Sequence, residues 1–311
     1  MCNIWQTEEA EDLDVSLLAR LPDFLRYVNL SGGEPFLHKD LPELAAAVIK
    51  ASPKAQIIIS TNALISRKII RDAMARIREF SPDAGIAVSI DGMGETHDRI
   101  RGVKGAFDRA VTLIESLKED GMTNLRIAFT IVDENVKDYY DVYQLSRRLG
   151  IEFTSAVAQG SDHYFQGTGM SPAAESDIRE QLDKVASSEL STNTPKRWAR
   201  AYFNRGLYQF ATGSGRPLAC KAAEDFFFLS PAGTIYACNV MDLQLGNLRD
   251  ASFSEIWNSE AAVKARAEVA ACHMGCWMVC TARSSMKRNP IRLAAWISSG
   301  KVKAHRGKPV I

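Results

Sequence analysis

The first half of the chain alternates between continuous apolar runs and amphipathic stretches. Five apolar runs, each ended by polar residues, predict buried strands at residues 27–30, 56–60, 85–90, 125–132 and 152–158. The stretches around them place apolar residues three and four positions apart, as in the stripe of Ile70, Met74 and Ile77, and predict helices. We expect these helices at 12–21, after Asp40, after Ser66, at 106–119 and at 138–149.

The predicted strands and helices form a parallel α/β arrangement. They repeat roughly every 30 residues, which is the size of one strand–helix–strand unit. The strands are apolar on both faces, which is typical of a parallel sheet covered by helices. Polar residues follow each strand directly, at 31–34, 60–62, 89–91, 133–135 and 159–163. Because the carboxyl ends of parallel strands meet at one edge, we expect an active site along that edge.

The end of the first strand reads NLSGGEPF, and the chain is organised around this turn. Gly32 and Gly33 let the backbone approach a ligand that a Cβ atom would keep away. Pro35 removes one N–H donor and fixes the exit of the turn. We therefore expect free peptide groups and the Glu34 carboxylate to face something small and polar. An ordinary turn would allow the same sequence, but five strand ends of similar polar character favour a ligand site.

The second half of the chain is helical first and contains a hairpin later. Residues 175–190 and 197–212 are expected to form two helices, the second with an aromatic stripe that belongs to the core. Residues 225–229 and 234–237 flank the sequence Ser-Pro-Ala-Gly and predict a β-hairpin. Residues 287–311 are basic, and we expect a solvated tail there rather than a patch for a partner or an anionic surface.

Composition and charge narrow the function classes. The chain has 311 residues, of which 46% are hydrophobic and 24% charged, enough for a large core in a soluble globular protein. Its formal net charge is only +1, so no global field favours nucleic acid as a partner. No stretch approaches a membrane-spanning length, and the acidic first residues lack the plan of a signal peptide. We expect a cytoplasmic protein.

The six cysteines are unevenly distributed. Cys2 stands alone, whereas five fall in one region of the second half: Cys220, Cys238, Cys272, Cys276 and Cys280. The predicted hairpin would bring the first two of these five together. A secreted disulfide framework would come with a signal peptide and more even spacing, so we favour a metal centre. A structural zinc site with four cysteine ligands and a group of buried free thiols are the alternatives.

In combination these motifs resemble the radical S-adenosylmethionine (radical SAM) enzyme family. The resemblance rests on Gly32-Gly33-Glu34-Pro35, on Thr61-Asn62-Ala63 where relatives carry Thr-Asn-Gly, and on the segments VSIDG at 88–92 and HDRIRG at 97–102. It implies an α/β fold with a partial (β/α)6 TIM-like barrel that here lacks its first strand. The cysteine-rich region is similar to the SPASM or twitch extension, a small C-terminal domain with a β-hairpin.

The resemblance also implies S-adenosyl-L-methionine (SAM) as a cofactor. In the family, the Gly-Gly-Glu motif contacts the methionine amino group of SAM. The residues that the resemblance assigns to SAM binding are Gly32, Gly33, Glu34, Pro35, Ser60, Asn62, Ser89 and Arg101. Of these, Ser89 and Arg101 are implied to lie near the ribose or the carboxylate. The alternative for Arg101 is a surface ion pair with Asp98.

The [4Fe–4S] cluster that binds SAM is expected to be incomplete in these residues. The family holds it with a C-x-x-x-C-x-x-C motif in the first strand, where three thiolates leave one iron open for SAM. Only Cys2, followed by Asn3-Ile4-Trp5, matches this motif, so we interpret the chain as starting inside it. The alternative is that Cys2 is an incidental thiol. One thiolate cannot retain the cluster, and we expect no reductive cleavage of SAM by the 311 residues alone.

The five C-terminal cysteines fit a single auxiliary Fe–S cluster of the twitch type. We favour Cys220, Cys238, Cys276 and Cys280 as its ligands, with Cys272 as a substitute. The expected organisation is a radical SAM core at 1–165, a helical connector at 166–215, the SPASM/twitch-like domain at 216–286 and the basic tail at 287–311.

The function implied by the resemblance is radical modification of a substrate. A 5′-deoxyadenosyl radical would abstract a hydrogen atom from a peptide, a protein or a small molecule. A reductant such as ferredoxin or flavodoxin would supply the electrons, and no nucleic acid is expected to take part. The competing hypothesis is a non-catalytic Fe–S or zinc-binding interaction protein derived from this family.

Overall fold

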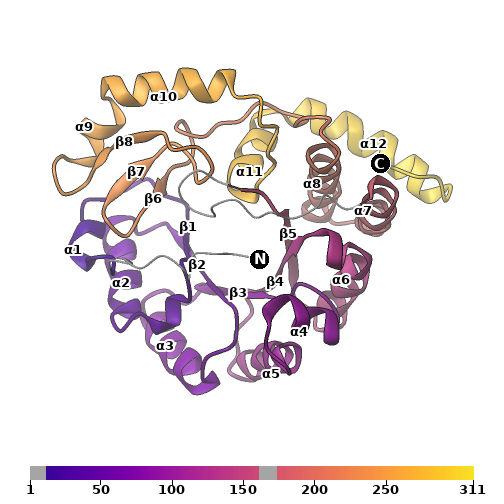
Figure 1. Ribbon diagram of the computed structural model, residues 1–311, viewed down its shortest axis with the longest axis horizontal. Coiled ribbons are helices and arrows are strands. Elements are labelled where there is room, and N and C mark those ends of the chain that lie inside the picture. Colours follow the sequence, from indigo (N-terminus) through magenta and orange to yellow (C-terminus); the bar gives the residue numbers. More distant parts are fainter. Residues whose placement is uncertain (1–11, 161–173) are drawn as a thin grey trace.

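Five parallel strands form one curved sheet, with helices on its outer side (Figure 1). The computed structural model describes residues 12–160 and 174–311. The strands lie side by side in sequence order: β1 (Tyr27–Leu30), β2 (Gln56–Thr61), β3 (Gly85–Ser89), β4 (Leu125–Ile131) and β5 (Glu152–Val157). All five predicted strands are confirmed, and the curved sheet is an open part of a barrel.

The register of the sheet aligns the carboxyl ends of its strands. Thr61 of β2 lies beside Val88 of β3, and Ser89 lies beside Ala128 of β4. Every neighbouring pair is parallel, so after each strand the chain must cross back from the carboxyl ends to the amino ends of the strands before the next strand begins. The polar segments that follow the strands consequently share one edge, which we call the carboxyl edge.

Helices cover the outer face because each buries an apolar stripe against the sheet. In α3 the predicted stripe of Ile70, Met74 and Ile77 is buried. The helix expected at 12–21 is only one turn long: it follows the N-cap residue Asp14 and ends at Leu18. The helical elements of this half are α1 (Val15–Leu18), η2 (Pro35–Leu37), α2 (Leu41–Ala51), α3 (Arg67–Phe80), α4 (Glu95–Arg101), α5 (Ala106–Glu119), η3 (Asp133–Asp138) and α6 (Tyr139–Arg148).

The second half adds two long helices and a small antiparallel sheet. The helices α7 (Glu175–Leu190) and α8 (Pro195–Ala211) pack against each other, and α7 also contacts α6. The predicted hairpin is formed by β6 (Phe228–Leu229) and β7 (Thr234–Tyr236), and β8 (Gln244–Asn247) adds a third strand. Three helices follow: α9 (Phe253–Trp257), α10 (Glu260–Ala271) and α11 (Val279–Arg288). In the two described ranges, no helix combines the length and the apolar character that crossing a membrane requires.

Residues 287–311 do not form the solvated tail that we expected. They contain a further helix, α12 (Pro290–His305), which packs on α7 and α8. Its Trp296 ring meets the ring of Tyr202 edge-on at a centroid distance of 5.4 Å, and Gly300 is buried beside Leu190. The prediction was wrong because the basic residues are interleaved with a stripe of small and apolar residues at helical spacing, which the high charge obscured.

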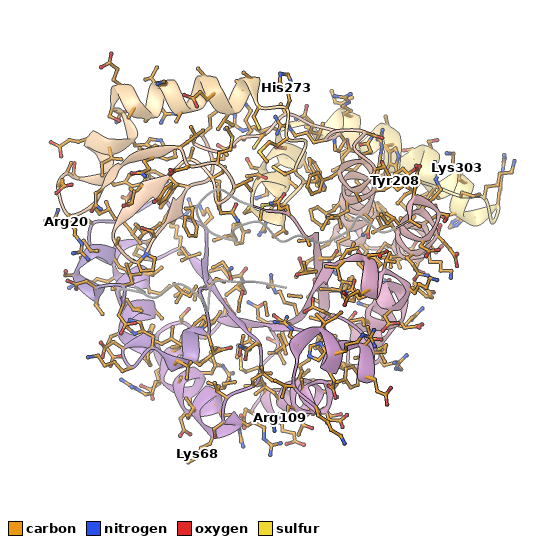
Figure 2. All side chains as sticks on the ribbon, viewed as in Figure 1. Arg20, Lys68, Arg109, Tyr208, His273 and Lys303 are labelled. Carbon is orange, nitrogen blue, oxygen red and sulfur yellow. The ribbon has the colours of Figure 1, made fainter. Side chains whose placement is uncertain are left out.

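The cysteine-rich region packs closely on the first half of the chain and on α8. Arg20 donates a hydrogen bond to the carbonyl of Leu248 at 2.6 Å, at the left of Figure 2. Trp277 donates to the carbonyl of Phe203 on α8 at 3.0 Å. Its indole fills the space beside Gly206, where a Cβ atom would lie 2.2 Å from Nε1. Helix α11 in turn contacts β5, so this region lies at the open side of the curved sheet (Figure 1).

Candidate active site and auxiliary cluster site

Glu34 fastens the turn after β1 to the end of β2. Its Oε2 accepts hydrogen bonds from the Thr61 hydroxyl at 3.0 Å and from the Asn62 N–H at 2.8 Å, and its Oε1 accepts from the Phe36 N–H at 3.3 Å. Burial raises the pKa of this carboxyl, while the three donors favour the charged form and lower it. Both oxygens are thus engaged within the protein, whereas the sequence suggested a carboxylate free to face a ligand. Its visible role is to position two strand ends.

Gly32 and Gly33 leave the carboxyl edge open next to this carboxylate. Gly32 has a φ of 155°, a backbone conformation that residues with a Cβ atom rarely adopt. A Cβ atom at either glycine would meet no described atom within 4 Å. Packing inside the described part of the chain therefore gives no reason for a glycine at position 33. The adjacent Pro35 starts η2, as expected for a residue without an N–H donor.

The turn after β2 keeps the geometry of a glycine turn although it carries Ala63. Ala63 has a φ of 60°, in the left-handed region. Its N–H donates to Thr61 Oγ1 at 3.1 Å, and the Leu64 N–H donates to Asn62 Oδ1 at 2.8 Å. Ser60, at the end of β2, donates to Asn29 of β1 at 3.1 Å. Thus the departure from Thr-Asn-Gly leaves the turn intact and places strain on one alanine.

Arg101 is oriented by a buried carboxylate that the sequence did not single out. Asp91 follows β3, is fully buried and forms an ion pair with Arg101. The other oxygen of Asp91 accepts a hydrogen bond from the Thr130 N–H of β4 at 2.7 Å. The alternative partner, Asp98, instead accepts hydrogen bonds from two N–H groups at the start of α5. Arg101 is therefore held next to the end of β3, where Ser89 also lies.

His97 and Asn135 complete this network below the carboxyl edge. The Nδ1 atom of the buried His97 accepts a hydrogen bond from the Asp91 N–H at 2.9 Å. Burial and the neighbouring Arg101 charge lower the pKa of His97 to about 4, so the ring is neutral and carries its proton on Nε2. Asn135 donates to the carbonyls of Asp91 and Thr130, both at 2.9 Å. The polar segments 89–91 and 133–135 were visible in the sequence, but their pairing follows only from the strand register.

The inner face of the sheet carries small side chains that keep partial solvent access. In β4 the partly exposed Arg126, Ala128 and Thr130 alternate with fully buried apolar residues, and in β5 Thr154 and Ala156 occupy the matching positions. A parallel sheet covered on both faces would bury every position. Among the described residues, the helices therefore cover the outer face of these strands, while the inward-facing positions keep partial solvent access.

Four cysteines of the second half line one cavity. They are Cys220, Cys238, Cys272 and Cys276. Cys280, the second residue of α11, lies within electrostatic reach of Cys220 and Cys276. The Sγ atom of Cys238 accepts a hydrogen bond from the Met241 N–H at 3.3 Å. The fold thus brings together all five cysteines that we predicted as ligands or substitutes.

Burial makes the thiolate form of these cysteines costly unless a positive charge compensates it. It raises the pKa of Cys276 and of Cys280 to about 12, and neighbouring cysteines act in the same direction. Arg216 also lines the cavity and lowers the pKa of Cys276. Its Nη2 donates to the Cys272 carbonyl at 3.0 Å, whereas its Nη1 is buried without a hydrogen-bond partner. Soft thiolate ligands beside the guanidinium of Arg216 fit an anionic Fe–S cluster.

A single zinc ion fits this arrangement less well. Zinc takes four ligands in a tetrahedron, with sulfur at about 2.3 Å, so all four sulfur atoms must converge on one point. Within 12–160 and 174–311, no three His, Cys, Asp or Glu side chains converge closely enough to hold a metal ion. An Fe–S cluster distributes its cysteines over several irons, so its ligands stand further apart.

Two parts of the expected site lie outside the described residues. One is Cys2, the predicted ligand of the SAM cluster, together with Asn3-Ile4-Trp5. The other is 161–163, the end of the polar segment that follows β5.

Two family models match the chain. Residues 6–146 match the radical SAM superfamily, and residues 220–280 match the SPASM iron–sulfur cluster-binding domain. The first match includes every residue described above at the carboxyl edge. The second begins at Cys220 and ends at Cys280.

Two curated relatives align with most of the chain. An AdoMet-dependent heme synthase of Oleidesulfovibrio alaskensis is 27% identical over 250 residues, which are 73% of this chain and 60% of that protein. The mycofactocin maturase MftC of Mycolicibacterium smegmatis is 27% identical over 266 residues, which are 81% of this chain and 62% of that protein. The chain therefore spans less than two thirds of the length of either relative.

A solved structure has the same fold. SuiB of Streptococcus suis, crystallised with the precursor peptide SuiA, aligns with a TM-score of 0.55 at 17% identity, over 75% of this chain and 54% of that one. The curved sheet of five parallel strands, the polar carboxyl edge and the cysteine-lined cavity agree with the two family matches. The chain belongs to the radical SAM superfamily and carries a SPASM-type iron–sulfur cluster-binding domain.

Proposed function

We propose that the protein is a radical SAM enzyme that binds SAM at the carboxyl edge and an auxiliary Fe–S cluster in the cysteine cavity. In this proposal residues 1–165 form the SAM-binding core and residues 216–286 hold the auxiliary cluster. Residues 166–215 are the helical connector between these two parts. When bound together, SAM and a reduced [4Fe–4S] cluster supply a 5′-deoxyadenosyl radical that takes a hydrogen atom from the substrate. The observation that carries the proposal is the convergence of the Gly-Gly-Glu turn, the Thr-Asn turn and Arg101 on one edge.

The residues of the carboxyl edge have complementary parts in this proposal. The open backbone at Gly32 and Gly33 accepts the amino group of the methionine moiety, while Glu34 fixes the turn that presents it. Arg101, held by Asp91, offers a guanidinium to the carboxylate of SAM. Ser89 offers a hydroxyl to the ribose, and Ser60 and Asn62 complete the lining. Holding Arg101 in place before SAM binds lowers the entropy lost on binding.

The substrate lies on the inner face of the sheet, where small side chains leave it solvent access. It is a peptide, a protein or a small molecule. The names of the relatives support both a peptide and a small molecule as the substrate. MftC is a maturase and SuiB was crystallised with a precursor peptide, whereas the other relative is a heme synthase. A reductant such as ferredoxin or flavodoxin supplies the electrons, and the auxiliary cluster passes electrons or binds the substrate.

The test measures 5′-deoxyadenosine formed from SAM with dithionite under anaerobic conditions. One thiolate, Cys2, cannot retain the SAM cluster, so the test also uses a protein engineered with an N-terminal extension that carries a strand and the other two cysteines of the family's motif. We expect the extended, reconstituted protein to form 5′-deoxyadenosine and the 311-residue chain to form none.

The substitution Gly33→Ala separates SAM binding from folding. A Cβ atom at position 33 meets no described atom, so the variant should unfold at the same denaturant concentration as the parent protein but bind SAM more weakly. Unchanged SAM affinity in calorimetry would contradict the pocket. Absence of turnover by a soluble, fully loaded extended protein would instead favour the non-catalytic binding hypothesis.

A further inference from the structure

Basic side chains surround the amino-terminal edge of the curved sheet, opposite the carboxyl edge. We call this group the basic mouth; it consists of Arg126, Lys196, Arg200, Arg283 and Lys287. These residues come from β4, α8 and α11, so the mouth forms only when the second half of the chain packs on the sheet. Tyr27, the first residue of β1, closes one side. Arg283 stacks 3.4 Å above its ring centre, and the Lys287 Nζ lies 5.6 Å from it.

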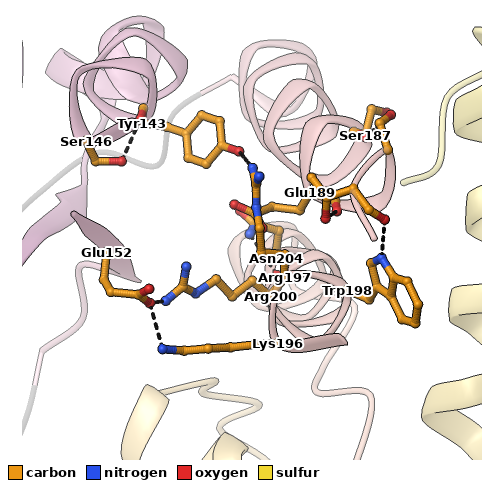
Figure 3. A network of polar contacts seen from close by, with 12 residues as sticks. Tyr143, Ser146, Glu152, Ser187, Glu189, Lys196, Arg197, Trp198, Arg200 and Asn204 are labelled. Carbon is orange, nitrogen blue, oxygen red and sulfur yellow. Dashed lines mark hydrogen bonds and ion pairs between the residues drawn. The ribbon is translucent and has the colours of Figure 1, made fainter. Parts of the chain in front are cut away.

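One carboxylate is seated among these cations. Glu152, the first residue of β5, pairs with the Nζ of Lys196 at 3.1 Å and with the guanidinium of Arg200 (Figure 3). The Nη2 atom of Arg126 donates to the side-chain oxygen of Asn124 at 2.8 Å, while its Nε atom is buried without a hydrogen-bond partner. The basic mouth therefore combines one ion-paired carboxylate with a buried donor that has capacity left for another anion.

The cations of the basic mouth raise the electrostatic energy of one another. Burial and the charges of Arg126 and Arg147 lower the pKa of Arg200 to about 10. Burial, followed by Arg126 and Arg283, also lowers the pKa of Lys196. A shift in this direction means that the charged forms are destabilised where they stand. An anion bound among them would relieve this repulsion, and the gain would be larger than at an exposed site.

The basic mouth opens onto the inner face of the sheet. Arg126 and Thr130 lie on the same side of β4, four positions apart, which is roughly 13 Å along a strand. Thr130 lies at the carboxyl edge, where its N–H binds Asp91 beside Arg101. Between them the inner face carries Ala128, with Thr154 and Ala156 on β5. A molecule anchored at the basic mouth can therefore extend along this face to the proposed SAM site.

We propose that the basic mouth binds a carboxylate of the substrate and aligns the substrate along the inner face. The inference rests on the proposed function, to which it adds the substrate class: a carboxylate-bearing molecule, either an acidic peptide or a tetrapyrrole with carboxylate side chains. Glu152 already pairs with Lys196 and Arg200, so a carboxylate is the kind of partner that these cations take. Guanidinium groups such as those of Arg126 and Arg283 bind a carboxylate through two parallel hydrogen bonds.

The test is a binding experiment with the full chain and without SAM or reductant, so its outcome is independent of turnover. One arm uses a porphyrin with four carboxylate side chains and its tetramethyl ester, followed by absorbance. The other arm uses a fluorescent peptide rich in glutamate and the same peptide with glutamine, followed by anisotropy. In at least one arm we expect the carboxylate form to bind about tenfold more tightly or better, because each lost charge-assisted hydrogen bond has an effect of that order. The arm that responds identifies the source of the carboxylate.

Substitutions test whether the carboxylate probe binds at the basic mouth. Arg126→Gln and Arg283→Gln should each weaken the carboxylate probe about tenfold, and the exposed position of Arg283 makes its variant the safer one for folding. Glu152→Gln should strengthen binding, because it removes the resident carboxylate that competes for the cations. Arg109→Gln removes the same charge from the outer side of α5 (Figure 2) and should change nothing.

Three results would overturn the proposal. The first is equal affinity for the carboxylate and neutral probes in both arms. The second is full affinity in folded Arg126→Gln and Arg283→Gln proteins. The third is complete displacement of the probe by an equal concentration of inorganic phosphate, which would indicate a phosphate-bearing ligand. The 5′-deoxyadenosine assay does not depend on any of these results, so failure here leaves the proposed function standing.

Discussion

At the scale of single residues, Glu34 and Asp91 act in the same way at the carboxyl edge. Each is a carboxylate that follows a strand and binds the end of the next strand, Glu34 through Thr61 and Asp91 through Thr130. A buried carboxylate without such partners would be strongly destabilising. Both groups are thus satisfied inside the protein and fix the positions of the groups that can meet a ligand, such as Arg101.

Ala63→Gly should leave the free energy of unfolding unchanged to within about 0.5 kcal/mol. Relief of the left-handed backbone of Ala63 gains about 1–2 kcal/mol. Loss of a buried methyl group costs about 0.8 kcal/mol, and the extra freedom of glycine in the unfolded chain costs about 0.5–1 kcal/mol. The control is Ala45→Gly, since Ala45 is equally buried but lies within α2, where glycine should cost about 1.5 kcal/mol or more. Equal losses for both variants in urea unfolding would contradict the strain at Ala63.

Cys276→Ala should abolish the auxiliary cluster, whereas Cys272→Ala should retain it. Cys276 belongs to the four favoured ligands, and its buried thiolate has no substitute unless Cys272 moves into its place. The measurement is the iron and sulfide content, with the visible absorbance, of anaerobically purified protein. Colourless parent protein with one zinc ion per chain would refute the Fe–S assignment. Full iron content in both variants would show that Cys272 replaces Cys276.

Residues next to strand ends could be predicted from the sequence, but their partners could not. Gly32, Glu34 and Arg101 stand in short motifs that follow apolar runs, and the structure places them at one edge. The ion pair of Arg101 with Asp91, instead of Asp98, depends on how α4 returns over the end of β3. That geometry is set by tertiary packing, which local sequence spacing does not contain.

At the scale of elements, prediction succeeded where a single apolar pattern decides the structure. The five strands of the first half are continuous apolar runs, and their observed bounds differ from the predicted ones by one residue or none. It failed for α12, where the basic residues of 287–311 suggested a solvated tail. Gly300 is the residue that lets α12 approach Leu190 closely, since a Cβ atom there would lie 2.9 Å from the leucine Cδ1. A glycine that would destabilise an isolated helix can thus allow that helix to pack closely in the folded protein.

Trp296→Ala should lower the free energy of unfolding by about 2 kcal/mol. The Trp296 ring packs edge-on against Tyr202 and lies under the guanidinium of Arg205. Full truncation of a buried tryptophan costs about 3–5 kcal/mol, and this one is only half-buried. Val302→Ala, on the exposed side of the same helix, should stay within about 0.5 kcal/mol of the parent. A solvated tail would predict no effect of either change in urea unfolding.

At the scale of the whole molecule, our two proposals assign separate tasks to the two edges of the sheet, which the inner face connects. The carboxyl edge holds the proposed SAM groups, and the basic mouth at the opposite edge depends on α8 and α11. The packing of Trp277 beside Gly206 fixes the cysteine-rich region against α8. The sequence predicted both halves of the chain as units. It did not predict that residues from the second half contribute to the basic mouth at the amino-terminal edge of the sheet. Such contacts between distant segments have no periodic signature in the chain.

Acid should destabilise the whole protein through His97 between about pH 6.5 and pH 4. The pKa of His97 is lowered to about 4 in the fold, from 6.5 for the free side chain, chiefly because the ring is buried. The unfolded chain therefore binds the proton more tightly, so this contribution to stability is complete above pH 6.5 and is lost as the pH falls toward 4. The shift of roughly 2.5 pKa units corresponds to roughly 3 kcal/mol.

A comparison of variants isolates this contribution from other titrating groups. His97→Asn keeps an acceptor for the Asp91 N–H and removes the titration, so its stability should fall less than that of the parent between about pH 7 and pH 4, by roughly 3 kcal/mol. Glu34, whose pKa burial raises, acts in the opposite direction but is present in both proteins. His305→Asn, at the exposed end of α12, should retain the full pH dependence. Parallel pH profiles of parent and His97→Asn in urea unfolding would show that His97 is not the acid-sensitive group of the fold.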